Sequence, residues 1–237
     1  MKLRNKNLKI LKSNHVYSEE MEHDACGVGL VASTEGLKSR KVVEYGIDAL
    51  KAVWHRGAID ADGKTGDGAG IHIEIPKDFF EEKIEVTGHK HDNSELCVGM
   101  IFLPRNDYSA QEQCRTIVES ELTKRNFSIY GWRQVPVDPS VLGEKAEQTR
   151  PEITQVLFTY NDKKVVNKSL EQKLYETRRV IEKEALNNQL NNFYICSFSS
   201  KSIIYKGMFL AEALSDFYTD LKDERFISRY AIFHQRF

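Results

Sequence analysis

The stretch FYICSFSSKSIIYKG, residues 193–207, places two strand-like runs next to each other in the sequence. Both runs are rich in aromatic and β-branched residues, which favour strands, and the polar SSKS between them is typical of a turn. The stretch therefore predicts a β-hairpin, whose two strands are antiparallel.

Further strand-like runs lie before and after this segment, and helical patterns separate them. Strands are predicted at 27–33, 71–75, 96–104, 127–137, 153–160 and 226–237, and a polar loop at 138–150. Helices are predicted from apolar faces at Val43, Ile47, Leu50 and Trp54; at Cys114, Ile117, Val118 and Leu122 within 109–125; at Leu174, Thr177, Ile181 and Ala185; and at Leu210, Leu214, Phe217 and Leu221. Because the strands come in adjacent pairs, the pattern indicates a layered α+β domain with antiparallel sheets and helices outside.

Composition excludes several classes of protein. The 237 residues are 41% hydrophobic, and 34 basic residues face 35 acidic ones. No run approaches the roughly 18 apolar residues that a membrane-spanning helix needs, and no apolar segment near the N-terminus indicates a secretory signal. The charge balance provides no broad basic surface for nucleic acid or an anionic membrane. We therefore expect a cytoplasmic protein.

The two ends of the chain differ in pattern. The first twenty residues are polar, rich in Lys and Asn, and have no sustained periodicity, which is typical of a leader. The last predicted strand runs to Phe237 with no turn or polar tail after it. We expect the chain to be part of a longer protein.

The four cysteines are widely spaced and form no C-x-x-C pair. Cys97, Cys114 and Cys196 lie in apolar contexts, which predicts small buried side chains rather than metal ligands. Cys26 differs, because it opens the glycine-rich run CGVGL.

Three motifs stand in order along the chain: EHDACGVGL at 22–30, HRGAIDADGKTGDGAG at 55–70 and YAIFHQRF at 230–237. Together they resemble the amidotransferase domain of glutamate synthase large subunits, a family of class II glutamine amidotransferases. The resemblance implies an α+β fold, the four-layer αββα sandwich of antiparallel sheets of N-terminal-nucleophile hydrolases, here incomplete at the C-terminus. It also implies a leader, residues 1–25, that is removed on maturation, and an amidotransferase domain over 26–237.

The resemblance implies that Cys26 is the catalytic nucleophile. Cleavage between Ala25 and Cys26 would make this cysteine terminal, with its own α-amine as the general base. The thiolate would attack the side-chain amide of L-glutamine, release ammonia and leave a thioester that water hydrolyses to glutamate. Arg236 matches the arginine that binds the substrate α-carboxylate, and Arg56 the arginine that shapes the glutamine pocket.

In the family the oxyanion-hole Asn-Gly pair and the acidic residue that binds the substrate amine follow the HQRF segment, and both would lie after Phe237. We therefore expect these 237 residues alone to be inactive. In the whole protein the resemblance implies an oxidoreductase, glutamate synthase, which assimilates ammonia into glutamate. A (β/α)₈ domain with FMN and an iron-sulfur cluster (3Fe-4S) would aminate 2-oxoglutarate. Electrons would come from a small subunit that binds NADPH and FAD, or from ferredoxin. No cofactor or metal site is assigned to this chain.

Two other interpretations stay open at this point. DGKTGDGAG, residues 62–70, has the glycines of a phosphate-binding turn, although it lacks the G-x-x-x-x-G-K-[ST] pattern. The domain could also keep the fold without catalysis, with the leader retained. His89 and His91 have a metal-like spacing, but a solvated loop is the simpler interpretation.

Overall fold

The structure is a computed structural model that describes residues 27–91, 94–162 and 168–236, with Lys6, Ile10 and Ser13 before them. It contains two four-stranded sheets in which every strand pair is antiparallel. The predicted leader, residues 1–25, and Cys26 lie outside the described residues, apart from those three leader positions. None of the described helices combines the length and apolar character that crossing a bilayer requires.

The first sheet has the order β1-β8-β2-β7. Its strands are β1 (Gly27–Ala32), β8 (Tyr230–Gln235), β2 (Ala69–Glu74) and β7 (Ser202–Gly207). The register places Gln235 opposite both Gly27 and Ala69, and Ala69 opposite Gly207. One end of this sheet therefore gathers the start of β1 and the end of β8, which are more than 200 residues apart in the sequence.

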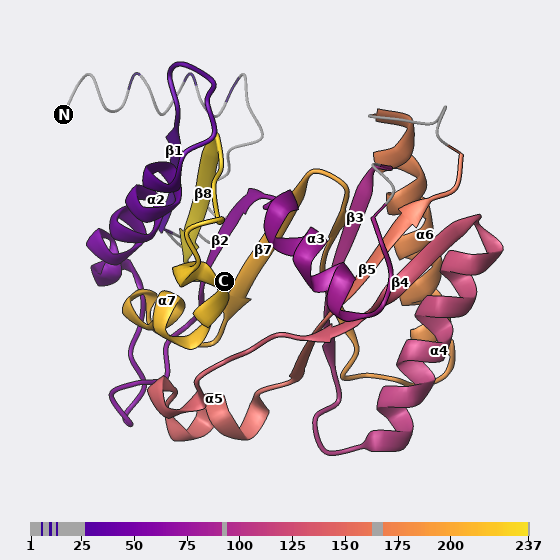
Figure 1. Cartoon of the computed structure of the whole chain (residues 1–237). Helices are drawn as coiled ribbons and strands as arrows, with labels where there is room; N and C mark the ends of the chain where they lie inside the picture. The colour runs from indigo at the N-terminus through magenta and orange to yellow at the C-terminus, as the bar shows by residue number, and fades with distance from the viewer. Residues whose placement is uncertain are drawn as a thin grey trace.

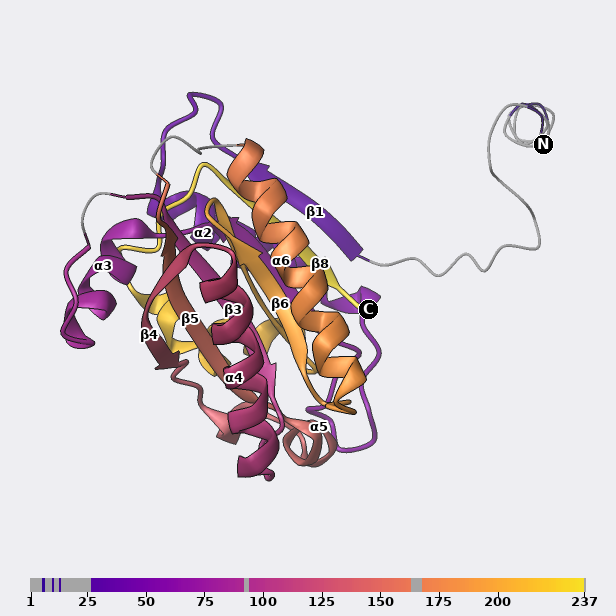
Figure 2. The same cartoon turned by 90° about the vertical axis from the view of Figure 1, so that its right-hand side faces the viewer.

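The second sheet has the order β4-β5-β3-β6. Its strands are β4 (Phe127–Gln134), β5 (Glu152–Tyr160), β3 (Leu96–Leu103) and β6 (Tyr194–Ser199). Helices α4 (Tyr108–Lys124) and α6 (Lys168–Asn187) contact each other and cover this sheet, as Figure 2 shows. Helix α2 (Arg40–Ala52) packs on β1 and β8 at the opposite side of the molecule (Figure 1). The order helix, sheet, sheet, helices is the predicted α+β sandwich.

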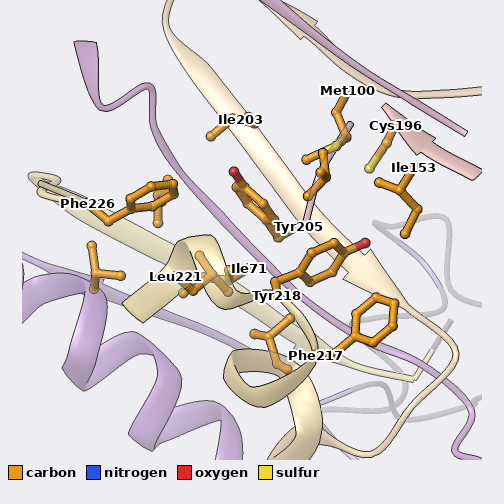
Figure 3. Packing of buried hydrophobic residues seen from close by; sticks show 14 of the residues in the cluster. Ile71, Met100, Ile153, Cys196, Ile203, Tyr205, Phe217, Tyr218, Leu221 and Phe226 are labelled. Atoms are coloured by element: carbon orange, nitrogen blue, oxygen red, sulfur yellow. The ribbon is translucent and has the colours of Figure 1, made fainter. Parts of the chain in front are cut away.

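Two hydrophobic cores follow from this layering. Cys114, Val118 and Leu122 of α4 lie fully buried with Leu174 and other residues of α6 beneath the second sheet, which confirms both predicted helix faces. The larger core joins α2 and the first sheet to the inner side of the second. Figure 3 shows its aromatic centre, which includes Tyr205 and Tyr218. The centroids of these two rings lie 5.0 Å apart.

The predicted hairpin at 193–207 is wrong in its pairing. β6 lies at the edge of the second sheet and β7 at the edge of the first, so the chain crosses between sheets at SSKS. Glu171 of α6 holds this corner: its carboxylate accepts the Ser200 backbone N–H at 2.8 Å and the Ser199 hydroxyl at 2.9 Å. The corner is thus fixed by a helix side chain instead of by a paired strand.

Two predicted helix features differ from the structure for local reasons. The helix predicted around Leu210–Leu221 is three short turns, η3 (Ala211–Ala213), α7 (Leu214–Phe217) and η4 (Thr219–Lys222). Tyr218 is extended between the last two, with its hydroxyl donating to the Lys206 carbonyl at 2.8 Å. Trp54 lies after α2 and is 55% exposed, so it is not on the buried face.

Two helical segments were not predicted as such. Helix α3 (Lys77–Val86) buries Phe79, Phe80 and Ile84 but follows a strand with little separation. The segment 138–150, predicted as a loop, contains η2 (Pro139–Val141) and α5 (Glu144–Thr149). The final strand begins only at Tyr230, four residues later than predicted.

Candidate active site

The three sequence motifs meet at one end of the first sheet. β1 begins at Gly27 and pairs there with Gln235, and the next residue, Arg236, donates its backbone N–H to the Gly68 carbonyl at 2.7 Å. Cys26 lies outside the described residues and directly precedes Gly27 in the sequence. The fold therefore brings together Gly27 of the first motif, the glycine-rich loop and the HQRF segment as far as Arg236.

Arg236 is held in an unusual conformation. Its φ is +79°, in the left-handed region that costs an ordinary residue about 1–2 kcal/mol. Its Nε lies 3.4 Å from Oδ2 of Asp67, and both side chains are about one-third exposed. The guanidinium is thus anchored at the Nε side, at the edge of solvent.

Asp67 also joins the beginning of its own loop, at Ala58, to the end that carries Asp67 itself. Its Oδ2 accepts the Ala58 N–H at 3.2 Å, and its backbone N–H donates to the Ala58 carbonyl at 3.3 Å. A further bridge pairs Ile59 with Gly66. Asp67 therefore hydrogen-bonds within the loop through both its side chain and its backbone.

The tip of the loop is closed by Asp62. Its carboxylate accepts the N–H groups of Lys64 and Thr65 and the Thr65 hydroxyl, at 2.9, 2.7 and 2.5 Å. The hydrogen bonds from Thr65, followed by that from the Lys64 N–H, hold the pKa of Asp62 well below its usual range. Because these two backbone donors already bind a carboxylate, the loop does not present them to a phosphate, which argues against the phosphate-binding interpretation.

The loop is docked on the protein through glycines. A Cβ on Gly66 would lie 2.8 Å from the Phe209 carbonyl oxygen, and one on Gly143 would lie 2.3 Å from Asp62 Oδ2. These contacts provide the tertiary support that the glycine-rich sequence requires. The glycines therefore allow a close approach between the loop and the body of the protein.

Arg56 lies in the turn η1 (Trp54–Arg56), and the structure describes only its backbone. The following residue, Gly57, rests on Gln235, because a Cβ there would lie 2.0 Å from the Gln235 Nε2. The turn that carries Arg56 therefore contacts the residue that precedes Arg236. The role of the Arg56 side chain stays a prediction.

Gln235 was not singled out from the sequence. It is 1% exposed, and among the residues that the structure describes neither its Nε2 nor its Oε1 has a hydrogen-bond partner. A buried polar group without a partner costs about 1–3 kcal/mol. No sequence signal could have identified it, since a glutamine in a strand is usually paired or solvated.

Two histidines of the first sheet have shifted pKa values. Burial lowers the pKa of His72, and burial together with the nearby Lys206 lowers that of His234. Both side chains are therefore favoured in the neutral form. His89 and His91 instead contact Thr87 and Glu81, with ring nitrogen to oxygen distances of 3.1 and 3.2 Å.

The other cysteines have structural positions. Cys97, Cys114 and Cys196 are buried, as predicted. Burial raises the pKa of Cys114 to about 11 and that of Cys196 to about 12, and raises that of Cys97 well above its usual range. They lie on α4, β6 and β3, and within the described ranges no three metal-ligating side chains come together. The described residues therefore do not fit an iron-sulfur cluster.

The chain is similar to known proteins along nearly its whole length. The sequence profile described as "Glutamine amidotransferases class-II" matches residues 26–237. The chain is 55% identical over 231 residues to "Glutamate synthase [NADPH] large chain" of Azospirillum brasilense, covering 98% of this chain and 15% of that protein. It is 38% identical over 217 residues to "Ferredoxin-dependent glutamate synthase 2" of Synechocystis sp., covering 91% and 14%. The chain thus spans about 15% of the length of these relatives.

Proposed function

Because this chain belongs to the class II glutamine amidotransferases, we propose that it forms the glutaminase site of a glutamate synthase, with Cys26 as the nucleophile. The observation that carries the proposal is the meeting of three motifs at one sheet end. Gly27, the residue after Cys26, pairs with Gln235, and Arg236 binds the glycine-rich loop through Gly68 and Asp67.

The proposed chemistry begins with removal of residues 1–25. The α-amine that this frees at Cys26 has a pKa of roughly 7.7–8.0, so it can accept the proton of the Cys26 thiol, whose pKa is roughly 8.5. The thiolate attacks the carboxamide carbon of L-glutamine, and the α-amine returns the proton to the leaving nitrogen. The C–N bond breaks, ammonia departs, and a γ-glutamyl thioester remains.

Water then hydrolyses the thioester to glutamate and restores the thiol. In this mechanism Arg236 binds the α-carboxylate of the substrate, because a guanidinium offers two parallel N–H donors to two carboxylate oxygens. Arg56, on the turn against Gln235, shapes the pocket beside the nucleophile.

One comparison supports a boundary at Cys26, and a second extends across it. The family profile begins its match at that residue. The Azospirillum alignment covers 98% of the chain, so it extends into the residues before Cys26 as well. We propose that residues 1–25 are a leader that this relative shares and that residues 26–237 belong to the amidotransferase domain.

For the whole protein we propose that the ammonia aminates 2-oxoglutarate to a second glutamate in the cytoplasm. The names of the relatives support either NADPH, through a small subunit, or ferredoxin as the electron donor. FMN and an iron-sulfur cluster would supply the redox chemistry. Since the described residues do not fit a cluster, no step of the mechanism above passes through one.

Intact mass and N-terminal sequencing of the complete gene product test the proposal, before and after treatment with the glutamine analogue 6-diazo-5-oxo-L-norleucine. We expect a chain that begins at Cys26 and gains one adduct there. A chain that keeps residues 1–25 and stays unlabelled at Cys26 would contradict the proposal and favour a non-catalytic domain.

A further inference from the structure

A single carboxylate oxygen joins two parts of the candidate site. Oδ2 of Asp67 lies 3.4 Å from Arg236 Nε and accepts the Ala58 N–H at 3.2 Å. Ala58 is two residues after Arg56, and Arg236 directly follows β8. Asp67 therefore connects the arm of the loop that follows Arg56 with the arginine proposed to bind the substrate.

The backbone beside Asp67 holds the same arginine a second time. The Gly68 carbonyl accepts the Arg236 N–H at 2.7 Å, and Arg236 has a φ of +79°. Gly68 itself has a φ of +118°, a conformation that glycine adopts easily. Residues 67 and 68 thus fix Arg236 at both its main chain and its guanidinium.

The position of the contact on the guanidinium matters for substrate binding. A guanidinium has five N–H donors in one plane, and only one of them is on Nε. A carboxylate at Nε fixes the plane of the group and the direction of its two terminal nitrogens. Without that contact an arginine side chain has more rotamers open to it. Its two terminal nitrogens then face a substrate carboxylate for a smaller share of the time.

The contact does little for the stability of the fold. Both side chains are about one-third exposed, and ion pairs in that setting contribute little because water screens them. The loop also keeps other bonds of its own, including the Asp60 N–H to the Thr65 carbonyl at 2.9 Å. The larger effect of losing the carboxylate charge should therefore appear in the site and not in unfolding.

We propose that Asp67 is a positioning residue of the glutaminase site, which sets the affinity for the substrate α-carboxylate by orienting the Arg236 guanidinium. This inference rests on the proposed function, since it requires Arg236 to bind glutamine.

The test uses the complete gene product with the substitution Asp67→Asn. Asparagine keeps an oxygen that can accept the Ala58 N–H but loses the charge that orients Arg236. We expect the KM for glutamine to rise about tenfold while kcat stays within about twofold, which is the pattern expected when binding is lost equally in the ground state and the transition state. Asp67→Glu, which restores the charge, should recover part of the affinity.

Asp60→Asn is the matched control, because Asp60 lies in the same loop and pairs at 2.7 Å with the exposed Lys145, away from Arg236. It should leave the KM unchanged.

Labelling distinguishes an effect on substrate binding from an effect on the reactivity of the nucleophile. Asp67→Asn should slow labelling by 6-diazo-5-oxo-L-norleucine, which carries an α-carboxylate, but not alkylation of Cys26 by iodoacetamide, which carries none.

Arg236→Lys separates the two proposals. If it raises the KM and Asp67→Asn does not, the inference on Asp67 is wrong and the proposed function stands. If neither substitution changes the KM, the proposed role of Arg236 is wrong as well. Equal slowing of both labels in Asp67→Asn would also overturn the inference, because Asp67 would then act on the nucleophile.

Discussion

Gln155 and Gln235 are both buried, at 0% and 1% exposure, but their side-chain amides differ in hydrogen bonding. Gln155, on β5, donates to the Tyr205 hydroxyl at 3.1 Å and accepts from Arg133 at 2.7 Å. Gln235, on β8, has no partner for either polar atom within the described part of the chain. One glutamine belongs to a satisfied network between the sheets, and the other lies at the candidate active site.

The network around Gln155 connects the two sheets. Arg133 of β4 binds Asp220 of η4 through both terminal nitrogens, at 2.7 and 2.6 Å, and the Tyr205 hydroxyl of β7 lies 3.2 Å from the same carboxylate. Every member has a partner, so the network can specify one arrangement of the sheets. At the site, an unpaired amide and a strained arginine occur within two consecutive residues, a local conflict of the kind that function imposes.

The largest expected effect follows from breaking the satisfied network. Arg133→Met removes the cation and leaves the carboxylate of Asp220, 5% exposed, buried with no positive charge beside it and only the Tyr205 hydroxyl of its network partners. We expect a loss of about 3–5 kcal/mol in the free energy of unfolding, measured in urea. Adding Asp220→Leu should recover most of it, because the uncompensated charge is gone. A loss below about 1 kcal/mol in the single variant would mean that the network does not hold the sheets.

The next effect tests the crowding at the site. Gly57→Ala places a Cβ 2.0 Å from the Gln235 Nε2, so the buried amide must move. We expect a loss of about 1–3 kcal/mol of stability from overpacking. Gln235→Ala makes room, so the double variant should lose less than the sum of the two single variants. Simple additivity would show that the turn of Arg56 and Gln235 are not coupled.

A smaller effect is expected from pH, through a histidine of the first sheet. Burial lowers the pKa of His72, so the unfolded chain binds the proton more readily than the folded one. Stability is therefore present above the unfolded pKa of about 6.5 and falls as the pH decreases below it, by at most about 1.4 kcal/mol per pH unit for one proton. Urea unfolding at pH 7 and pH 5 should show this decrease, and His72→Gln should reduce it to the part that His234, whose pKa is also lowered, contributes. An unchanged slope in His72→Gln would contradict the role of His72.

The sequence predicted helices α4 and α6 better than it predicted the pairing of strands β6 and β7. The faces of α4 and α6 follow directly from apolar spacing, because a helix buries one side of its own local repeat. Strand pairing depends on distant residues, and the SSKS corner separates two sheets because Glu171 binds Ser199 and Ser200. Likewise Tyr218 interrupts a periodic helix pattern through a contact with Lys206, which no local pattern reveals.

The candidate site was predictable in part. The family resemblance identified Cys26, Arg56 and Arg236, but the structure describes only Arg236 with its side chain. The unpaired amide of Gln235 could not be predicted, because whether a buried group finds a partner depends on the packing of Gly57 above it. The contact between Asp67 and Arg236 joins two motifs about 170 residues apart and likewise required the fold.

The most direct test of the contrast between the two regions is the free energy of unfolding of Gln155→Met and Gln235→Met, measured side by side. Methionine has a similar shape to glutamine and no polar amide. We predict that Gln155→Met destabilises by about 1–3 kcal/mol, because it leaves the Tyr205 and Arg133 partners unsatisfied, whereas Gln235→Met is neutral or stabilises by up to about 1 kcal/mol. Equal destabilisation by both substitutions would contradict the account, since the Gln235 amide would then stabilise the fold as the Gln155 amide does.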